Sequence, residues 1–263
     1  MCATNRRSEV RLQRRDLELF ELLLERRVET LGHLHRLAFD GKAQKTARNR
    51  LIRLRQGGYI ERVALSGIDG QLLAEGDSEH PVASVYRLTP KGIAALRLRH
   101  RAGAELRGRR PRGDLTDPSI PHQLAVNRVG DWLHARLIGE HLLDPAGKDR
   151  RHRPDGAYHA RPDSDGRTLV LVEVDLGNYT RQRILGKLRT FLANEESRAA
   201  IFVTPTAERA EQIAGWIRAR HGDGVMRRVQ VLTFDELRNG QLLDPQLSPV
   251  ATNPGFDDPS PTM

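Results

Sequence analysis

The stretch Thr168-Leu-Val-Leu-Val-Glu-Val-Asp-Leu-Gly177 decides the fold of the C-terminal half, because it is the longest run that is typical only of a β-strand. Successive side chains of a strand point to opposite faces. One face of this strand therefore carries Val170, Val172, Val174 and Leu176, whereas Glu173 and Asp175 share the other face with two leucines. These two carboxylates lie about 7 Å apart along the strand. Because a buried carboxylate requires a cation, a metal ion or water, this strand end, together with Asp155, is the candidate site of the C-terminal half.

The segments around this strand alternate between helix and strand. Apolar residues at helical spacing predict helices, and short apolar runs between turn residues predict strands. In order, we expect a helix from about 119 to 142, a strand at 156–160, the strand at 168–177, a helix at 179–193, a strand at 199–204, a helix at 207–221 and a strand at 229–234. A hairpin followed by βαβαβ predicts a mixed sheet with helices on both faces, and hence an α/β domain.

The N-terminal half has a different pattern, in which three helices precede a strand hairpin. We expect helices from Asp16 to about 28, from 31 to 38 and from 42 to 55, followed by strands at 59–65 and 83–88. This order predicts a winged helix-turn-helix, an α+β fold, with the acidic loop 66–81 as the tip of the wing.

A fourth helix is predicted after the hairpin, because Thr89 is a good cap and Pro90 is favoured in a first turn. The passage 86–92 resembles the wing-to-helix passage of many bacterial winged-helix regulators. Such a fourth helix often serves dimerisation, so a homodimer is expected.

The third helix combines a buried apolar stripe, expected at Ala47, Leu51 and Leu54, with a basic surface that contains no acid. In a helix-turn-helix, the first residues of this helix reach base edges, where Gln and Asn pair with adenine and Arg with guanine. The remaining Arg and Lys side chains hold phosphates. The alternative is an ordinary helix with a solvated basic face. The predicted DNA-binding residues are Lys42, Gln44, Lys45, Arg48, Asn49, Arg50, Arg53 and Arg55.

The excess positive charge of the chain is confined to its first part. Residues 1–113 contain 24 Lys and Arg against 13 Asp and Glu, whereas residues 114–263 contain 19 against 21. Such clustering is typical of a nucleic-acid-binding half joined to a half with another role, with general solubility as the alternative. Double-stranded DNA is therefore the expected partner.

Other features limit the location of the protein and its domain boundaries. The single Cys2 excludes an intramolecular disulfide and a cysteine zinc cluster. No apolar run approaches the roughly 20 residues that span a bilayer, and the N-terminus lacks the apolar segment of a signal peptide. A cytoplasmic protein without membrane contact is therefore expected. Its expected parts are a basic arm at 1–15, the winged helix-turn-helix at 16–99, an Arg-rich linker at 100–118, the α/β domain at 119–243 and a disordered tail at 244–263.

The order of elements in the second half, with an acid at the first hairpin strand and a Glu at the second, resembles the PD-(D/E)xK nuclease superfamily. The matching positions are Pro154-Asp155 and Glu173-Val174-Asp175. With the winged helix, the Arg-rich linker, Lys187-Leu-Arg-Thr-Phe191 and Phe202-Val-Thr-Pro205, the arrangement resembles the bacterial replication-relaxation family over about residues 14–235. That family is associated with plasmids and other mobile elements. The resemblance implies that the α/β domain is restriction-endonuclease-like.

The resemblance also implies Mg²⁺- or Mn²⁺-assisted hydrolysis of a phosphodiester. Asp155 and Glu173 are the implied metal ligands, with the Val174 carbonyl and waters. The metal would polarise the phosphate and lower the pKa of the attacking water. The lysine that helps to orient this water in the superfamily is replaced here by Asp175.

Three options follow from that replacement. Lys187 of the next helix supplies the missing cation, or Asp175 is an additional metal ligand, or the site does not cut. The predicted catalytic residues are accordingly Asp155, Glu173, Asp175 and Lys187, and the three acids are the predicted metal ligands.

A purely structural interpretation of the acids also stays open. Glu173 and Asp175 could end a strand at the solvent surface, with Arg181 or Arg183 as ion-pair partners, and Asp155 could be a turn residue. Two functions are therefore compatible with the sequence. The first is a sequence- or structure-selective DNA-binding protein of a plasmid or other mobile element, which acts in replication or transfer and carries a nuclease-like domain. The second is a winged-helix transcription regulator whose C-terminal domain serves only dimerisation or partner binding.

Overall fold

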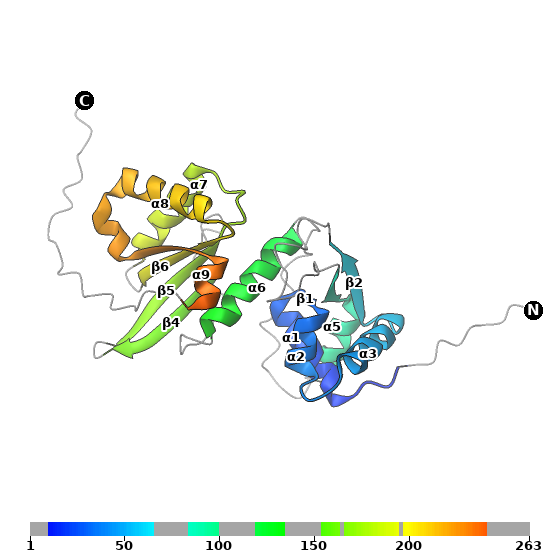
Figure 1. Cartoon of the computed structure of the whole chain (residues 1–263). Coiled ribbons are helices and arrows are strands. Elements are labelled where there is room, and N and C mark those ends of the chain that lie inside the picture. Colours follow the sequence, from blue (N-terminus) through cyan, green and yellow to red (C-terminus); the bar gives the residue numbers. More distant parts are fainter. Residues whose placement is uncertain are drawn as a thin grey trace, which may run out of the picture. The chain divides into compact units, whose positions relative to one another are not determined.

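The computed structural model describes residues 10–65, 84–99, 119–134, 154–163, 166–194 and 197–240 (Figure 1). The chain divides into two compact units, Met1–Asn127 and Arg128–Met263. The division falls inside helix α6 (Ile120–His134), whereas we expected the second domain to begin at residue 119. The predicted wing tip at 66–81, the linker at 100–118 and the tail at 244–263 lie outside the described residues.

The first unit consists of helices packed on a small antiparallel sheet. The helices are α1 (Arg14–Arg26), α2 (Leu31–Ala38), α3 (Gln44–Gln56) and α5 (Pro90–Arg99), and the strands are β1 (Glu29–Thr30), β2 (Ile60–Ala64) and β3 (Ser84–Leu88). The strand order is β1-β3-β2, and β3 is antiparallel to both neighbours. The sequence predicted each of these elements except the two-residue strand β1, which lies where we expected the first helix to end.

Helix α1 buries a different stripe from the predicted one. It starts two residues before Asp16, whose side chain accepts a hydrogen bond from the Gln13 backbone N–H (2.6 Å) and so still caps the helix. Helical spacing predicts a stripe of Leu17, Phe20 and Leu24. The structure buries Leu19, Phe20 and Leu23, so only Phe20 of the predicted stripe is fully buried, and the two leucines are partly buried against the same core. Because leucines surround this helix on nearly all sides, periodicity alone does not choose the inner face.

The turn after α3 is fastened to the start of α5. The Thr89 hydroxyl donates to the Gly58 carbonyl (2.6 Å) and accepts a hydrogen bond from the Gly92 N–H (3.2 Å), so Thr89 caps α5 as predicted. A Cβ atom on Gly92 would lie only 2.3 Å from the Tyr59 carbonyl oxygen. Glycine is therefore required for this close approach, which fixes the C-terminal end of α3 against α5.

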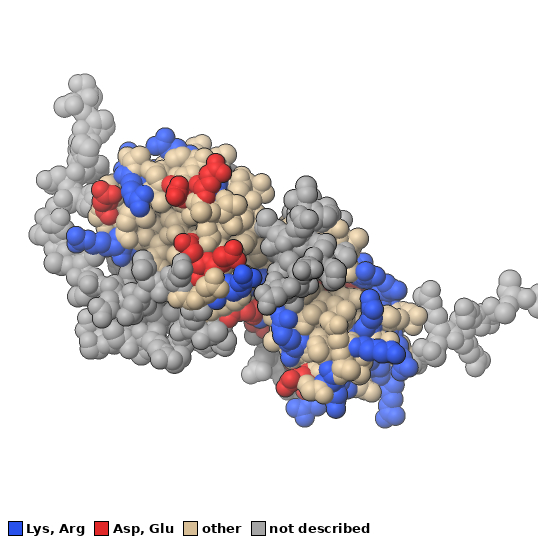
Figure 2. Space-filling model, viewed as in Figure 1, with Lys and Arg blue, Asp and Glu red and all other residues tan. Residues whose placement is uncertain are grey.

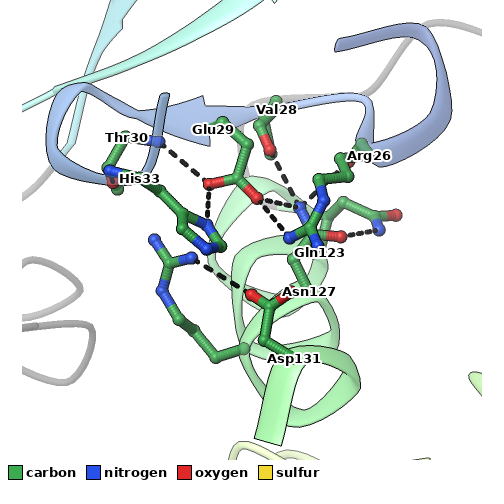
Figure 3. Close-up of polar contacts among 9 residues, drawn as sticks. Arg26, Val28, Glu29, Thr30, His33, Gln123, Asn127 and Asp131 are labelled. Atoms are coloured by element: carbon green, nitrogen blue, oxygen red, sulfur yellow. Dashed lines mark hydrogen bonds and ion pairs between the residues drawn. The ribbon is translucent and has the colours of Figure 1, made fainter. Parts of the chain in front are cut away.

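A buried carboxylate, Glu29, connects several elements of the first unit (Figure 3). One oxygen lies 2.8 Å from His33 Nδ1, and the other lies 3.0 Å from an Arg26 guanidinium nitrogen. The Asn127 amide donates to Glu29 (3.3 Å) and to two carbonyls of the connection between α1 and β1 (2.9 and 3.1 Å). This network fastens the first half of α6 to the first unit.

The second unit contains a four-stranded mixed sheet, as predicted. The strands are β4 (Gly156–Asp163), β5 (Gly166–Val174), β6 (Ser197–Thr204) and β7 (Val229–Thr233), in the order β4-β5-β6-β7. β4 and β5 are antiparallel, whereas β5, β6 and β7 are parallel. The helices are α7 (Arg181–Leu192), α8 (Ala207–His221) and α9 (Phe234–Asn239), with a short 3₁₀ helix, η4 (Asp223–Arg227).

Helices cover both faces of this sheet. On one face, Leu169, Leu171 and Phe202 form a core with apolar residues of α7 and α8. On the other face, Gly130 of α6 approaches Tyr158 so closely that a Cβ there would lie 3.0 Å from the tyrosine hydroxyl. Because Glu173 follows Leu171 by two residues, its side chain points to the α7 and α8 face. Among the described helices, none is both long and apolar enough to cross a membrane.

Candidate functional site

Helix α3 exposes a basic surface in the first unit. Ala47, Leu51 and Leu54 are buried, as predicted, so the side chains between them point outward. Figure 2 shows Lys and Arg side chains gathered where α3 lies in Figure 1. No acid lies in the first turn, and the positive end of the helix dipole adds to the field there. We define the α3 surface as the exposed residues Lys42, Gln44, Lys45, Arg48, Asn49, Arg53 and Arg55.

The structure separates Arg50 from this set. Its guanidinium pairs with the fully buried Asp16 carboxylate, with Nε 2.8 Å from Oδ1, and it also donates to the Arg11 carbonyl (2.9 Å). The hydrogen bond to Asp16 is the main cause that raises the pKa of Arg50. This arginine therefore joins α3 to α1, and we leave it out of the α3 surface.

The connection between α2 and α3 is short and well anchored. Phe39 is buried, with the Arg15 guanidinium 5.1 Å from its ring centroid. Gly41 has a positive φ of 68°, which suits glycine, and the ring Nε2 of His35 contacts the Lys42 carbonyl (2.5 Å). The tight turn holds the start of α3 in place and leaves its first residues exposed.

In the second unit, two predicted site residues lie at the end of β5. The Asp155 backbone N–H donates to the Val172 carbonyl (3.0 Å), and its carboxylate accepts a hydrogen bond from the Val174 N–H (2.9 Å). Asp155 is half-buried, whereas Glu173 is completely buried. Their carboxylates are close enough that Asp155 is a main cause of the raised Glu173 pKa, second only to burial.

The third member of this cluster is Lys187 of α7. Its ammonium forms an ion pair with Glu173 Oε1, and the Lys187 side chain is only 3% exposed. The positive charge opposes the raised pKa of Glu173, without removing it. We call Asp155, Glu173 and Lys187 the carboxylate–lysine centre. The Glu173 side chain faces neither solvent nor Arg181 and Arg183, which differs from the surface-strand interpretation.

The structure places Asp175 elsewhere. One of its oxygens accepts hydrogen bonds from the backbone N–H groups of Gly177 (3.0 Å) and Tyr179 (3.1 Å). The other pairs with Arg209 of α8, whose Nε lies 2.8 Å away. Asp175 is fully buried, and both oxygens are occupied by the loop between β5 and α7 and by Arg209. This arrangement braces the loop between β5 and α7.

Tyr179 and Arg209 are residues whose importance the sequence did not reveal. Burial, and then the neighbouring carboxylates of Asp155 and Glu173, raise the pKa of Tyr179 well above its ordinary value. Tyr179 precedes Lys187 by eight residues, or two steps of four, and this spacing was the available signal. Arg209 lies 34 residues after Asp175, and no local pattern links the two.

The donor set of the carboxylate–lysine centre fits Mg²⁺ or Mn²⁺. The buried Glu173 oxygens are paired with the Lys187 ammonium and lie beside the Asp155 carboxylate. A divalent cation would bind these oxygens and offset the repulsion from Asp155. Within the described ranges, no group of three or more His, Cys, Asp and Glu side chains is arranged to hold a metal. Two carboxylates suffice for Mg²⁺, which usually keeps several waters.

Comparison with known protein families assigns this chain to a family. The family model described as replication-relaxation matches residues 20–200. The match covers most of the described part of the first unit and, in the second, runs through α7 into β6. No curated protein and no solved structure matches the sequence.

Proposed function

Because the chain belongs to the replication-relaxation family, we propose that it binds double-stranded DNA of a plasmid or other mobile element through the α3 surface. In this proposal the first unit is a winged helix-turn-helix, and the protein acts in replication or transfer. The observation that carries the proposal is the α3 surface itself, which presents five cations and two amides and no carboxylate.

The chemistry of the α3 surface suits a DNA groove. Gln44, Lys45, Arg48 and Asn49 lie in the first two turns, where a recognition helix meets base edges. Arg53 and Arg55 lie in the last turn and are placed for phosphates. The buried stripe and the Arg50–Asp16 pair hold the backbone of α3 rigid, so little conformational entropy is lost on binding.

A charge-matched binding experiment tests this proposal. Arg48→Ala combined with Arg53→Ala removes two cations from the α3 surface, and Arg14→Ala combined with Arg97→Ala removes two exposed cations from α1 and α5. We expect the first pair to weaken binding to duplex DNA and to reduce the slope of log affinity against log salt by about 2. The second pair should change neither. Equal effects of the two pairs would show that α3 is not the contact surface.

We propose a second role for the carboxylate–lysine centre, in metal-dependent cleavage of a phosphodiester. The observation that favours it is the buried, ion-paired Glu173 beside Asp155, an arrangement that a purely structural strand end does not need. Asp155 and Glu173 would hold Mg²⁺ or Mn²⁺, which supplies Lewis-acid activation of phosphate and water. Lys187 offsets negative charge at Glu173. In this proposal it supplies the positive charge that a lysine at position 175 would otherwise supply.

Cleavage is tested directly on supercoiled and linear DNA with Mg²⁺ or Mn²⁺. We expect nicking or cutting by the wild-type chain and none by Glu173→Ala, while Asp235→Ala, which removes an exposed acid of α9, leaves it unchanged. DNA binding without cleavage in either metal would instead favour the winged-helix regulator, whose second unit serves partner binding only.

The homodimer remains a prediction. Leu98 of α5 is 63% exposed, which makes this helix the surface to examine. Sedimentation equilibrium of the full chain beside Leu98→Glu tests it, and equal masses at the monomer value would contradict a dimer through α5.

A further inference from the structure

Three residues at a spacing of four form a row that begins just before α7 and continues along one side of it. They are Tyr179, Arg183 and Lys187, and side chains four apart are neighbours on a helix surface. At the inner end, Lys187 pairs with the buried Glu173. Arg183, in the middle of the row, is exposed. The row therefore leads from the carboxylate–lysine centre to the protein surface.

The Tyr179 ring connects the two cations. The Arg183 guanidinium carbon lies 3.7 Å from the ring centroid, and the Lys187 ammonium lies 5.5 Å from it. Tyr179 is 8% exposed, and its backbone is held by Asp175. A guanidinium stacked on a fixed ring has a defined orientation, because the flat face is against the ring and the N–H edges point away from it.

Comparison with Arg209 shows what is unusual about Arg183. The Arg209 guanidinium also lies over an aromatic ring, 5.0 Å from the Trp216 centroid, but it is tied to the Asp175 carboxylate and the Tyr179 carbonyl. Within the described part of the chain, the Arg183 side chain has no carboxylate partner and no hydrogen-bond acceptor. Arg209 thus has the contacts of a structural arginine, whereas Arg183 is oriented but keeps its donors available.

The ligand that suits such a group is a phosphodiester. A guanidinium edge presents two parallel N–H donors that match two phosphate oxygens. The first turn of α7 contains no acid, and its helix dipole favours an anion at the same end. Any anion at this place is also close to the acids Asp155 and Glu173, so a divalent cation between them would favour its binding.

We propose that Arg183, oriented by Tyr179, binds a DNA backbone phosphate beside the carboxylate–lysine centre. This inference rests on the proposed function, because the ligand is DNA. It requires that the second unit bind DNA, and it does not require that the unit cleave it. It assigns a second DNA contact to the chain, in the unit that does not carry α3.

The test uses the full chain in which the α3 surface is weakened by Arg48→Ala and Arg53→Ala. Affinity for a fluorescent duplex is measured at several salt concentrations with Ca²⁺, an oxygen-binding cation. Into this background we introduce Arg183→Ala, Arg183→Lys or Arg189→Ala, the last being an exposed arginine of α7 outside the row. We expect Arg183→Ala to weaken binding about tenfold and to lower the salt slope by about one phosphate contact.

The control variants decide the interpretation. Arg189→Ala should match the background, and Arg183→Lys should restore the salt slope, since it keeps the charge, but only part of the affinity, since it loses the planar donor pair. Tyr179→Phe keeps the ring and should bind like the background. If Arg183→Ala and Arg189→Ala behave alike, or if the background binds DNA no better than its Arg183→Ala derivative, the proposal is wrong.

The outcome is separable from that of the proposed cleavage. An Arg183 effect on binding in a chain that cuts no DNA would refute the nuclease role and leave the phosphate contact in place. If cleavage depends on Glu173 while Arg183→Ala changes neither DNA binding nor KM, the nuclease role is supported and the phosphate contact of Arg183 is refuted.

Discussion

Among the residues that the structure describes, each unit contains one completely buried glutamate, and the two are held in different ways. In the first unit, Glu29 receives His33 and a backbone N–H at one oxygen, and Arg26 and Asn127 at the other (Figure 3). In the second unit, Glu173 pairs with the Lys187 ammonium and lies beside a second carboxylate, Asp155. Both glutamates are completely buried, but Glu29 is surrounded by hydrogen-bond donors, whereas Glu173 lies between one ammonium and a second acid.

The contrast indicates what each glutamate is for. A buried carboxylate with all its oxygens hydrogen-bonded fixes the surrounding elements and has little capacity for another ligand. A buried carboxylate that lies beside a second acid is costly unless cations offset both charges. We therefore interpret Glu29 as structural and Glu173 as a ligand for a cation, and the following experiments test that division.

The largest effect should come from Glu29→Ala. It leaves His33, Arg26 and Asn127 without their common acceptor, and removal of one partner from a buried charged network typically costs about 3–5 kcal/mol. Hydrogen exchange of amides in α1 and β1 measures the loss locally, and Glu25→Ala, an exposed acid of α1, is the matched control. Protection that is the same in both variants would mean that the network contributes little.

Loss of the lysine in the other cluster should have a smaller effect. Lys187→Met leaves Glu173 buried without its cation, but Glu173 can take up a proton, so we expect a loss of about 2 kcal/mol instead of the full cost of an unpaired charge. Unfolding followed by fluorescence reports this unit, since both tryptophans, Trp132 and Trp216, lie in it. Adding Glu173→Gln to Lys187→Met should recover part of the loss. A double variant that is less stable than the single one would contradict this account.

The stability of the second unit should depend on pH through Glu173. The pKa of Glu173 is raised above 4.5, first by burial and then by Asp155. Above pH 4.5 the unfolded chain releases this proton while the folded chain retains it, so the contribution of Glu173 to stability is lost as pH rises through the folded pKa. Glu173→Gln removes this dependence, which denaturant unfolding between pH 4.5 and 8 measures. Identical pH profiles for the wild type and Glu173→Gln would show that the carboxyl does not titrate as described.

Metal addition offers an independent check. Mg²⁺ or Mn²⁺ that binds only the folded state stabilises it by mass action, so the second unit should melt at a higher temperature in the wild type and not in Glu173→Gln. Glu29→Gln, altered in the first unit, should keep the response. A response that survives Glu173→Gln would place the metal elsewhere.

Several of these features could be predicted from the sequence because they depend on local pattern. The mixed sheet follows from long apolar strands separated by periodic helices, and the buried stripe of α3 follows from Ala47, Leu51 and Leu54 at helical spacing. Lys187 could be predicted as the residue that supplies the missing positive charge, because it is the only lysine of its helix. Its ion pair with Glu173 depends on how α7 packs against β5.

Contacts between distant residues could not be derived in this way. Glu29 and Asn127 lie 98 residues apart, and Asp175 and Arg209 lie 34 apart. At such separations, tertiary packing decides which residues pair. The sequence contains many arginines, and it does not indicate which of them pairs with a given acid. The same limit explains why Arg50 was grouped with the DNA contacts, since its pairing with Asp16 crosses from α3 to α1.

The smallest effect is expected for a third glutamate, which is paired but not buried. Glu61 of β2 pairs with Arg87 of β3 at 2.5 Å, but the two side chains are 46% and 26% exposed. An exposed pair typically contributes only about 0.2–1 kcal/mol, because water solvates both charges and salt screens them. Glu61→Ala should therefore change hydrogen exchange in β2 and β3 only slightly, and less in 0.5 M salt than at low salt. A loss as large as that of Glu29→Ala would mean that pairing, and not burial with complete hydrogen bonding, sets the difference between the glutamates of this chain.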